Sequence, residues 1–217
     1  MPGVEVIIPA YNEERTVAGV VAAARACPLV ERVVVVDDGS TDRTAEIARH
    51  AGAEVVCLRP NRGKTAAILA GGEATSSPIL ILLDGDLLGL GPSHLETLAG
   101  PVLRGEAAMT VGVFQDGRLI TDLSQRLTPF LNGQRALCRE LLRGLWGAEK
   151  RRYAADTLLS RYARHLRLPV RLVPLPGLTH VMKEEKLGWA RGFASRLRMF
   201  AEVFTAFLTA WPPDGGS

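Results

Sequence analysis

The stretch that decides the fold is ILILLDGD, residues 79–86. Its five apolar residues form a short continuous run, which is typical of a parallel β-strand buried on both faces. Asp84 and Asp86 follow at once and lie two positions apart, so in extended backbone both side chains point to the same side. Proteins hold magnesium or manganese with one or two carboxylates together with substrate phosphates. The pattern therefore indicates a metal site at the end of a buried strand; the alternative is a plain Asp-Gly-Asp turn.

Two earlier apolar runs also end in polar segments. Residues 4–9 (VEVIIP) predict a strand that leads into Pro9-Ala10-Tyr11, and residues 32–36 (RVVVV) predict one that leads into Asp37-Asp38-Gly39. Because ligands collect at the carboxyl ends of parallel strands, we expect these two segments to converge with Asp84-Gly85-Asp86 on one crevice.

Helices alternate with these strands. We expect the first helix to open at Asn12-Glu13-Glu14 with Asn12 as its N-cap, and the next to run from Thr41 to Ala51, capped by Ser40 or Thr41 and closed by Gly52. A strand at Glu54–Leu58 and a helix at Lys64–Glu73 follow. The alternation implies βαβ units with right-handed crossovers, and hence an α/β fold with a mainly parallel sheet.

The pattern after Pro92 is less regular. It predicts the following elements: a helix at 93–103, a strand at 107–114, a turn at 116–117, a helix at 153–166, a strand at 170–175 and a long final helix at 189–211. Residues 127–142 mix turn and helix signals. We interpret the whole chain, 1–217, as a single domain in which 1–90 form one half and 91–217 the other.

The composition is that of a compact globular domain. The chain has 217 residues, of which 47% are hydrophobic and 23% charged. No run approaches the roughly 20 apolar residues of a membrane span, so we expect a cytoplasmic protein. Three cysteines at wide spacings, Cys27, Cys57 and Cys138, suit neither a disulfide framework nor a zinc site. The net charge is only +3, but lysine and arginine concentrate after about residue 125 and acidic residues before it. The basic second half favours an anionic partner such as a phosphorylated acceptor; a solvated basic face is the alternative. We expect no nucleic-acid partner.

Three further side chains are candidates for the site. Asp38 follows a strand, where an exposed carboxylate accepts a hydrogen bond from a base imino group or a ribose hydroxyl, or serves only as part of a turn. Lys64 follows Gly63 at a helix start, which favours anion capture, although a solvated lysine fits as well. His180 follows a predicted strand and offers an imidazole to a metal; a lone histidine is more often structural.

Four blocks of the first 90 residues resemble the family-two glycosyltransferases of the GT-A fold. They are VIIPAYNEE (6–14), VVVDDGSTD (34–42), NRGK (61–64) and LDGDL (83–87). The resemblance implies a Rossmann-like nucleotide-sugar-binding fold with a divalent cofactor, Mg2+ or Mn2+, held by the Asp84 and Asp86 motif. It also implies a donor site for a UDP- or GDP-sugar, formed by Pro9, Ala10, Tyr11, Glu13, Asp38, Lys64, Asp84, Gly85 and Asp86.

The second half is similar to a smaller branch of this family, the glucosyl-3-phosphoglycerate synthases. This likeness implies that His180 completes the metal shell with Asp84 and Asp86. It assigns Gly133, Gln134 and Arg135 to the acceptor site. It also makes Glu149 a candidate catalytic residue, together with Asp86. The acceptor would then be a small phosphorylated acid such as 3-phosphoglycerate. The sequence does not choose between inversion and retention at the sugar carbon.

Other functions stay open. The aromatic and leucine positions of 189–211 fall largely on one helical face with arginines nearby, which suits sugar transfer to a polyprenyl phosphate or another lipid with peripheral membrane contact. The same pattern suits a helix that packs in the core or in a homodimer. A catalytically silent nucleotide-sugar-binding protein and a nucleotidyltransferase are two more hypotheses. An early glycine-rich phosphate loop would favour the last, and residues 11–14 read YNEE instead.

Overall fold

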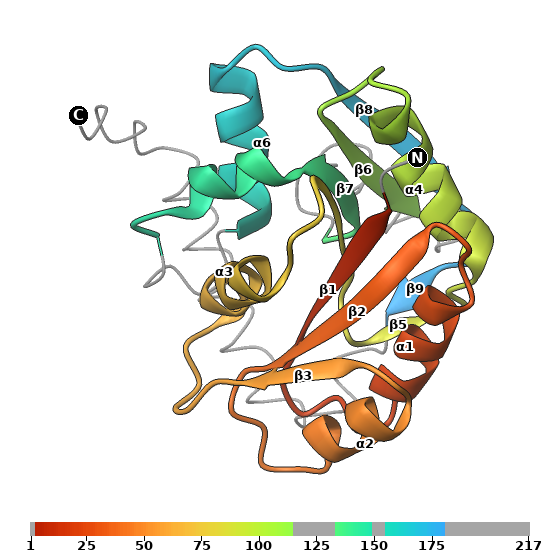
Figure 1. Cartoon of the computed structure of the whole chain (residues 1–217), viewed down its shortest axis with the longest axis vertical. Helices are drawn as coiled ribbons and strands as arrows, with labels where there is room; N and C mark the ends of the chain where they lie inside the picture. The colour runs from red at the N-terminus through yellow and green to blue at the C-terminus, as the bar shows by residue number, and fades with distance from the viewer. Residues whose placement is uncertain (1–2, 115–132, 149–154, 181–217) are drawn as a thin grey trace, which may run out of the picture.

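The computed structural model of the chain describes residues 3–114, 133–148 and 155–180. Its centre is a seven-stranded sheet with the strand order β3-β2-β1-β4-β7-β6-β8 (Figure 1). The strands of this sheet are β1 (Val4–Ala10), β2 (Val30–Asp37), β3 (Glu54–Cys57), β4 (Ile79–Leu82), β6 (Met109–Phe114), β7 (Arg135–Cys138) and β8 (Val170–Leu175). A small second sheet pairs β5 (Leu87–Leu88) with β9 (Thr179–His180).

The pairing confirms the predicted α/β fold. β1 runs parallel to both β2 and β4, and β2 runs parallel to β3, so the first four strands point the same way. Only β7 is antiparallel to its neighbours, β4 and β6. The sheet is therefore mostly parallel, and the carboxyl ends of β1, β2 and β4 lie at one edge.

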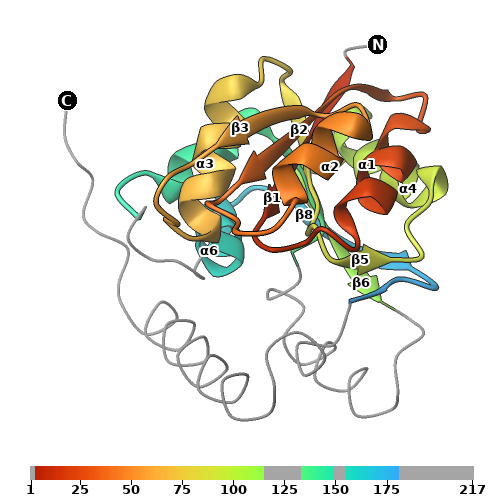
Figure 2. The same ribbon diagram turned by 90° about the horizontal axis from the view of Figure 1, so that it is seen from below.

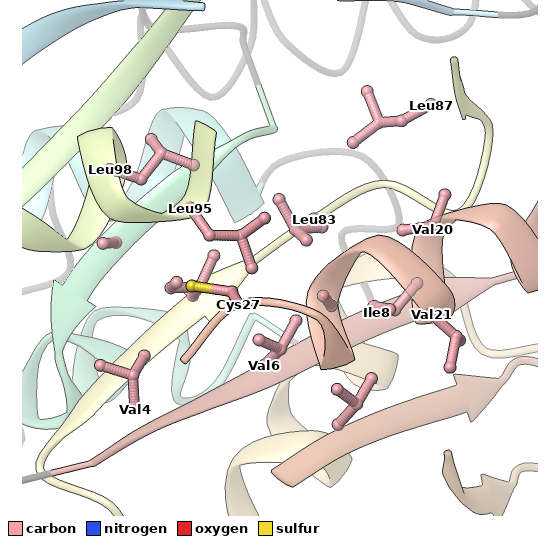
Figure 3. Close-up of a cluster of buried hydrophobic side chains, with 14 of the residues drawn as sticks. Val4, Val6, Ile8, Val20, Val21, Cys27, Leu83, Leu87, Leu95 and Leu98 are labelled. Atoms are coloured by element: carbon pink, nitrogen blue, oxygen red, sulfur yellow. The ribbon is translucent and has the colours of Figure 1, made fainter. Parts of the chain in front are cut away.

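Helices cover both faces of the sheet, as Figures 1 and 2 show. They are α1 (Val17–Arg25), α2 (Thr44–His50), α3 (Lys64–Ala74), α4 (Pro92–Leu103), the 3₁₀ helix η2 (Arg139–Leu145) and α6 (Ala155–His165). Side chains of β1 alternate between the two faces. Val4, Val6 and Ile8 pack towards α1 and α4 in the cluster of Figure 3, whereas Ile7 packs towards α3. Each face of the sheet thus has its own apolar core.

Two predicted helix starts are wrong, and three strands, β5, β7 and β9, were missed. α1 begins at Val17 rather than at residue 12, because Asn12 adopts a left-handed backbone with φ of 56°. α2 begins at Thr44, and neither Ser40 nor Thr41 caps it. β7 lies within residues 127–142, where turn and helix signals were mixed. Gly52 does take the predicted positive φ, 91°.

Among the described residues, no helix is long and apolar enough to cross a membrane. The predicted turn at 116–117 and the predicted helix at 189–211 lie outside the described residues. Cys27 is buried and Cys57 exposed, and all three cysteines are free thiols.

A buried glutamate joins the amino-terminal ends of the strands. Glu5 is 2% exposed; its Oε2 accepts hydrogen bonds from the backbone N–H groups of Ser76 and Ser77, and its Oε1 pairs with Arg32. Burial works to raise the pKa of Glu5, but the Ser77 and Ser76 N–H groups and Arg32 outweigh it and hold the pKa below its ordinary value. The charged form is therefore the one that the fold stabilises.

We predict that Glu5→Gln lowers the free energy of unfolding by about 2 kcal/mol at neutral pH, because the amide oxygen can replace Oε2 for the two backbone N–H groups, but the amide nitrogen then faces the guanidinium of Arg32. A depressed pKa contributes stability above the unfolded pKa and loses it as pH falls through the folded value. The gap between wild type and variant, measured by urea unfolding, should thus narrow at acid pH. Glu54→Gln is the matched control, since Glu54 also pairs with Arg32 but is exposed. A gap that stays constant with pH would contradict this account.

Candidate active site

The three polar segments meet at one edge of the sheet, as the sequence predicted. The N–H of Asp38, after β2, donates to the carbonyl of Ala10 at 2.9 Å. The hydroxyl of Thr16 donates to the carbonyl of Gly85 at 2.8 Å. A Cβ on Gly85 would lie 3.3 Å from that of Ala10, so the loop after β4 packs directly against the end of β1.

The loops after β1 and β2 are held together by side chains that look like helix caps in the sequence. Asn12 Oδ1 accepts a hydrogen bond from the N–H of Thr41, and the N–H of Asn12 donates to Ser40 Oγ. The N–H of Glu13 donates to the hydroxyl of Thr44. Asn12 therefore joins two loops rather than capping its own helix, and the preceding residue, Tyr11, is 47% exposed.

Asp38 is buried, not exposed as expected. Only 4% of its surface is accessible, and its two oxygens accept the backbone N–H groups of Arg62 and Gly63, each at 2.7 Å. These bonds fix the loop that precedes α3. Each oxygen retains a second lone pair, so contact with a nucleoside stays a prediction for this residue.

Lys64, the first residue of α3, points into the site. Its Nζ lies 2.7 Å from Asp84 Oδ1 and 3.0 Å from Asp156 Oδ2, which excludes the solvated lysine of the alternative interpretation. Burial works to lower the pKa of Lys64, but Asp156 and Asp84 outweigh it and hold the pKa above its ordinary value. The ammonium group is thus a fixed positive charge beside the acidic pair.

The residues before and within β7 contact Lys64 and the two carboxylates that pair with it. Gln134 Nε2 donates to Asp84 Oδ2 at 3.2 Å, and Gly133 lies so close to Asp84 and Lys64 that a Cβ would overlap them. The guanidinium of Arg135 is fully buried and contacts Asp156 and Ser160. The acceptor role of Gly133, Gln134 and Arg135 stays a prediction.

Sequence reasoning missed Asp156. It lies in α6, 13% of its side chain is exposed, and it stands between Lys64 and Arg135. Burial lowers the pKa of Arg135, and Asp156 and Asp84 offset part of that effect. No motif surrounds Asp156; an acidic residue in the first turn of a predicted helix was the only signal. The catalytic candidate Glu149 lies outside the described residues.

Asp84, Asp86 and His180 form a cluster in which one ligand atom from each lies within 4.8 Å of the others. The pairing of β5 with β9 places Leu87 opposite His180, so His180 Nδ1 lies 2.9 Å from Asp86 Oδ1. Its ring also packs against Phe114, with 5.1 Å between ring centroids. Burial acts to lower the pKa of His180, but Asp86 and Asp84 outweigh it and raise the pKa. Two carboxylates and an imidazole at this spacing fit one divalent cation of the magnesium or manganese class.

The fold and the acidic crevice define a nucleotide-sugar-type α/β domain, and comparison with known proteins gives its family. Residues 5–160 match the model of the family "Glycosyl transferase family 2". The chain therefore belongs to glycosyl transferase family 2.

Individual relatives agree with this assignment. Glucosyl-3-phosphoglycerate synthase of Mycobacterium tuberculosis is 34% identical over a stretch covering 51% of this chain and 37% of that protein. An undecaprenyl-phosphate 4-deoxy-4-formamido-L-arabinose transferase of Pseudomonas paraeruginosa is 43% identical over 39% of this chain and 28% of that protein. The matched stretches thus cover 28% to 37% of the length of these curated relatives.

Solved structures match over more of the chain. A glucosyl-3-phosphoglycerate synthase from Mycobacterium tuberculosis, in complex with Mn2+, uridine diphosphate and glucosyl-3-phosphoglycerate, aligns with a TM-score of 0.71 and 28% identity. That alignment covers 99% of this chain and 82% of the solved chain. A complex of the same enzyme with phosphoglyceric acid aligns with a TM-score of 0.73.

We predict that Asp156→Ala lowers the free energy of unfolding by about 3 kcal/mol, because it leaves the buried Arg135 without its carboxylate. Ser160→Ala is the matched control, since Ser160 contacts the same guanidinium through a neutral hydroxyl, and about 1 kcal/mol is expected from that loss. Chemical denaturation of both variants gives the comparison. Equal losses would show that the charge of Asp156 is not what stabilises Arg135.

Proposed function

We propose that this chain is a metal-dependent glycosyltransferase that moves a sugar from a UDP- or GDP-sugar to an acceptor. The observation that carries the proposal is the cluster of Asp84, Asp86 and His180 beside the ammonium group of Lys64, at the carboxyl ends of β1, β2 and β4. Oxygen and imidazole ligands meet there with a fixed positive charge. This combination suits a diphosphate coordinated to a divalent cation.

Each group has a role in this proposal. Asp84, Asp86 and His180 would hold Mg2+ or Mn2+, which offsets negative charge on the departing diphosphate when it is bound. Lys64 would release one of its carboxylates and pair with a phosphate oxygen. Asp38 fixes the loop before α3, and through it the position of Lys64.

The acceptor proposal rests on the relatives. The solved enzyme aligned over 99% of this chain was crystallised with phosphoglyceric acid. Together with the basic second half of the sequence, this favours a small phosphorylated acid such as 3-phosphoglycerate. One relative is named for transfer involving undecaprenyl phosphate, which keeps a lipid phosphate as the second candidate acceptor.

Calorimetric titration of nucleoside diphosphates with Mn2+, and again with chelator, tests the donor site. We predict that UDP or GDP binds only with metal, and that Asp86→Ala abolishes this binding because one metal ligand is lost. Glu96→Ala, an exposed change on α4, is the control and should bind as wild type does. Wild-type affinity in Asp86→Ala would refute the assignment. Metal-dependent binding without turnover would instead support the catalytically silent hypothesis.

A turnover assay with the donor found by titration tests the acceptor. We predict that 3-phosphoglycerate stimulates release of the nucleoside diphosphate, since a basic site attracts its carboxylate and phosphate. Dolichyl or undecaprenyl phosphate in detergent is the comparison. Stimulation by the lipid phosphate alone would overturn the small-acid proposal and leave the donor site untouched.

A further inference from the structure

His94, in the first turn of α4, connects that helix to the loop that delivers His180. Its Nδ1 lies 3.0 Å from the backbone N of Gly91, which donates to it. Its Nε2 lies 2.9 Å from the carbonyl oxygen of Pro176. Pro176 is the first residue after β8 and lies four positions before His180. One imidazole therefore bridges the start of α4 and the connection between β8 and β9.

The two contacts fix the state of the ring. A backbone N–H only donates, so Nδ1 must carry a lone pair, and a carbonyl oxygen only accepts, so Nε2 must carry the proton. His94 is thus the neutral tautomer with hydrogen on Nε2. In this form a single side chain satisfies one N–H at the helix start and one loop carbonyl.

The loop is held at two further points. A Cβ added at Gly89, whose φ is 79°, would collide with the carbonyl oxygen of Gly177, so the segment after β5 runs directly against this loop. Leu178 is 2% exposed and packs into the apolar core. These contacts leave β9 little freedom to slide along β5, and it is this pairing that sets His180 against Asp86.

We propose that His94 is a positioning residue for the metal site, holding the Pro176–Leu178 loop through its Nε2–H so that His180 stays within reach of Asp86. The inference rests on the proposed function, since it assigns His94 to the cluster of Asp84, Asp86 and His180. His94 itself does not join that cluster. It acts on His180 through the backbone, as outer groups orient metal ligands in other sites.

Two isosteric substitutions separate the two contacts of His94. In asparagine, the amide oxygen takes the place of Nδ1 and still accepts the hydrogen bond from the N–H of Gly91. In glutamine, the amide nitrogen takes the place of Nε2 and still donates to the carbonyl of Pro176. His94 is partly exposed near the start of a helix, so both variants are expected to fold. His50→Asn is the control, because the hydrogen bond of His50 is to the carbonyl of Glu46 in its own helix.

The measurement is the affinity for Mn2+ in the presence of saturating UDP or GDP, whichever binds wild type, with thermal unfolding of the metal-free proteins beside it. We expect His94→Asn to weaken Mn2+ binding roughly tenfold, as losses of outer metal-site contacts do. His94→Gln and His50→Asn should stay close to wild type, while the metal-free melting temperatures of the two His94 variants remain similar.

The outcomes distinguish the two proposals. If wild type shows no metal-dependent nucleotide binding, the proposed function fails. If wild type binds and His94→Asn binds equally well, only the role of His94 is refuted. Equal weakening in His94→Asn and His94→Gln would also refute it, because the loss would not follow the contact with Pro176.

Discussion

The site depends on the placement of Lys64 between Asp84 and Asp156. Two partly buried carboxylates at the edge of an apolar sheet would repel each other and resist desolvation, and an ammonium group within 3.0 Å of both offsets part of that cost. The fully buried Arg135 on the far side of Asp156 completes an alternating row of charges. This row places a fixed positive charge beside Asp84, one of the two aspartates of the candidate metal site.

Contacts between the loops at the strand ends hold these charged side chains in place. Both carboxylate oxygens of Asp38 accept hydrogen bonds from the loop before α3. The end of β2 therefore determines where α3 begins and where Lys64 lies. Hydrogen bonds of Asn12 with Ser40 and Thr41 join the loops after β1 and β2 on the neighbouring side of the site. Each contact joins segments that are distant in sequence, and each lies at the carboxyl ends of the parallel strands. The strands that carry the two apolar cores thus also position the site.

Local patterns predicted the strands of the parallel part of the sheet and the meeting of their carboxyl ends. The run ILILLDGD predicts both a buried strand and the acidic pair, because a continuous apolar run and the carboxylates after it are features of a few adjacent residues. Asn12 was misinterpreted, since a cap and a loop bridge use the same side chain and only the tertiary partner distinguishes them. β7 was missed because the strand has only four residues and follows a stretch of turn signals.

Side chains that act across the fold left little signal in the local sequence. Asp156 joins Lys64 only because α6 packs against α3, and His94 reaches Pro176 only because α4 lies beside the end of β8. His180 was predicted through family resemblance, and the antiparallel pairing of β5 with β9 explains in physical terms how it reaches Asp86. Such contacts depend on topology, which periodicity alone does not specify.

The central claim is that these strand ends hold one divalent cation. Anomalous diffraction from crystals grown with Mn2+ and UDP, recorded at the manganese absorption edge, locates the ion directly. The account predicts a peak bounded by Asp84, Asp86 and His180, with Lys64 turned towards the diphosphate. Bound nucleotide without a manganese peak, or a peak away from these three side chains, would contradict it.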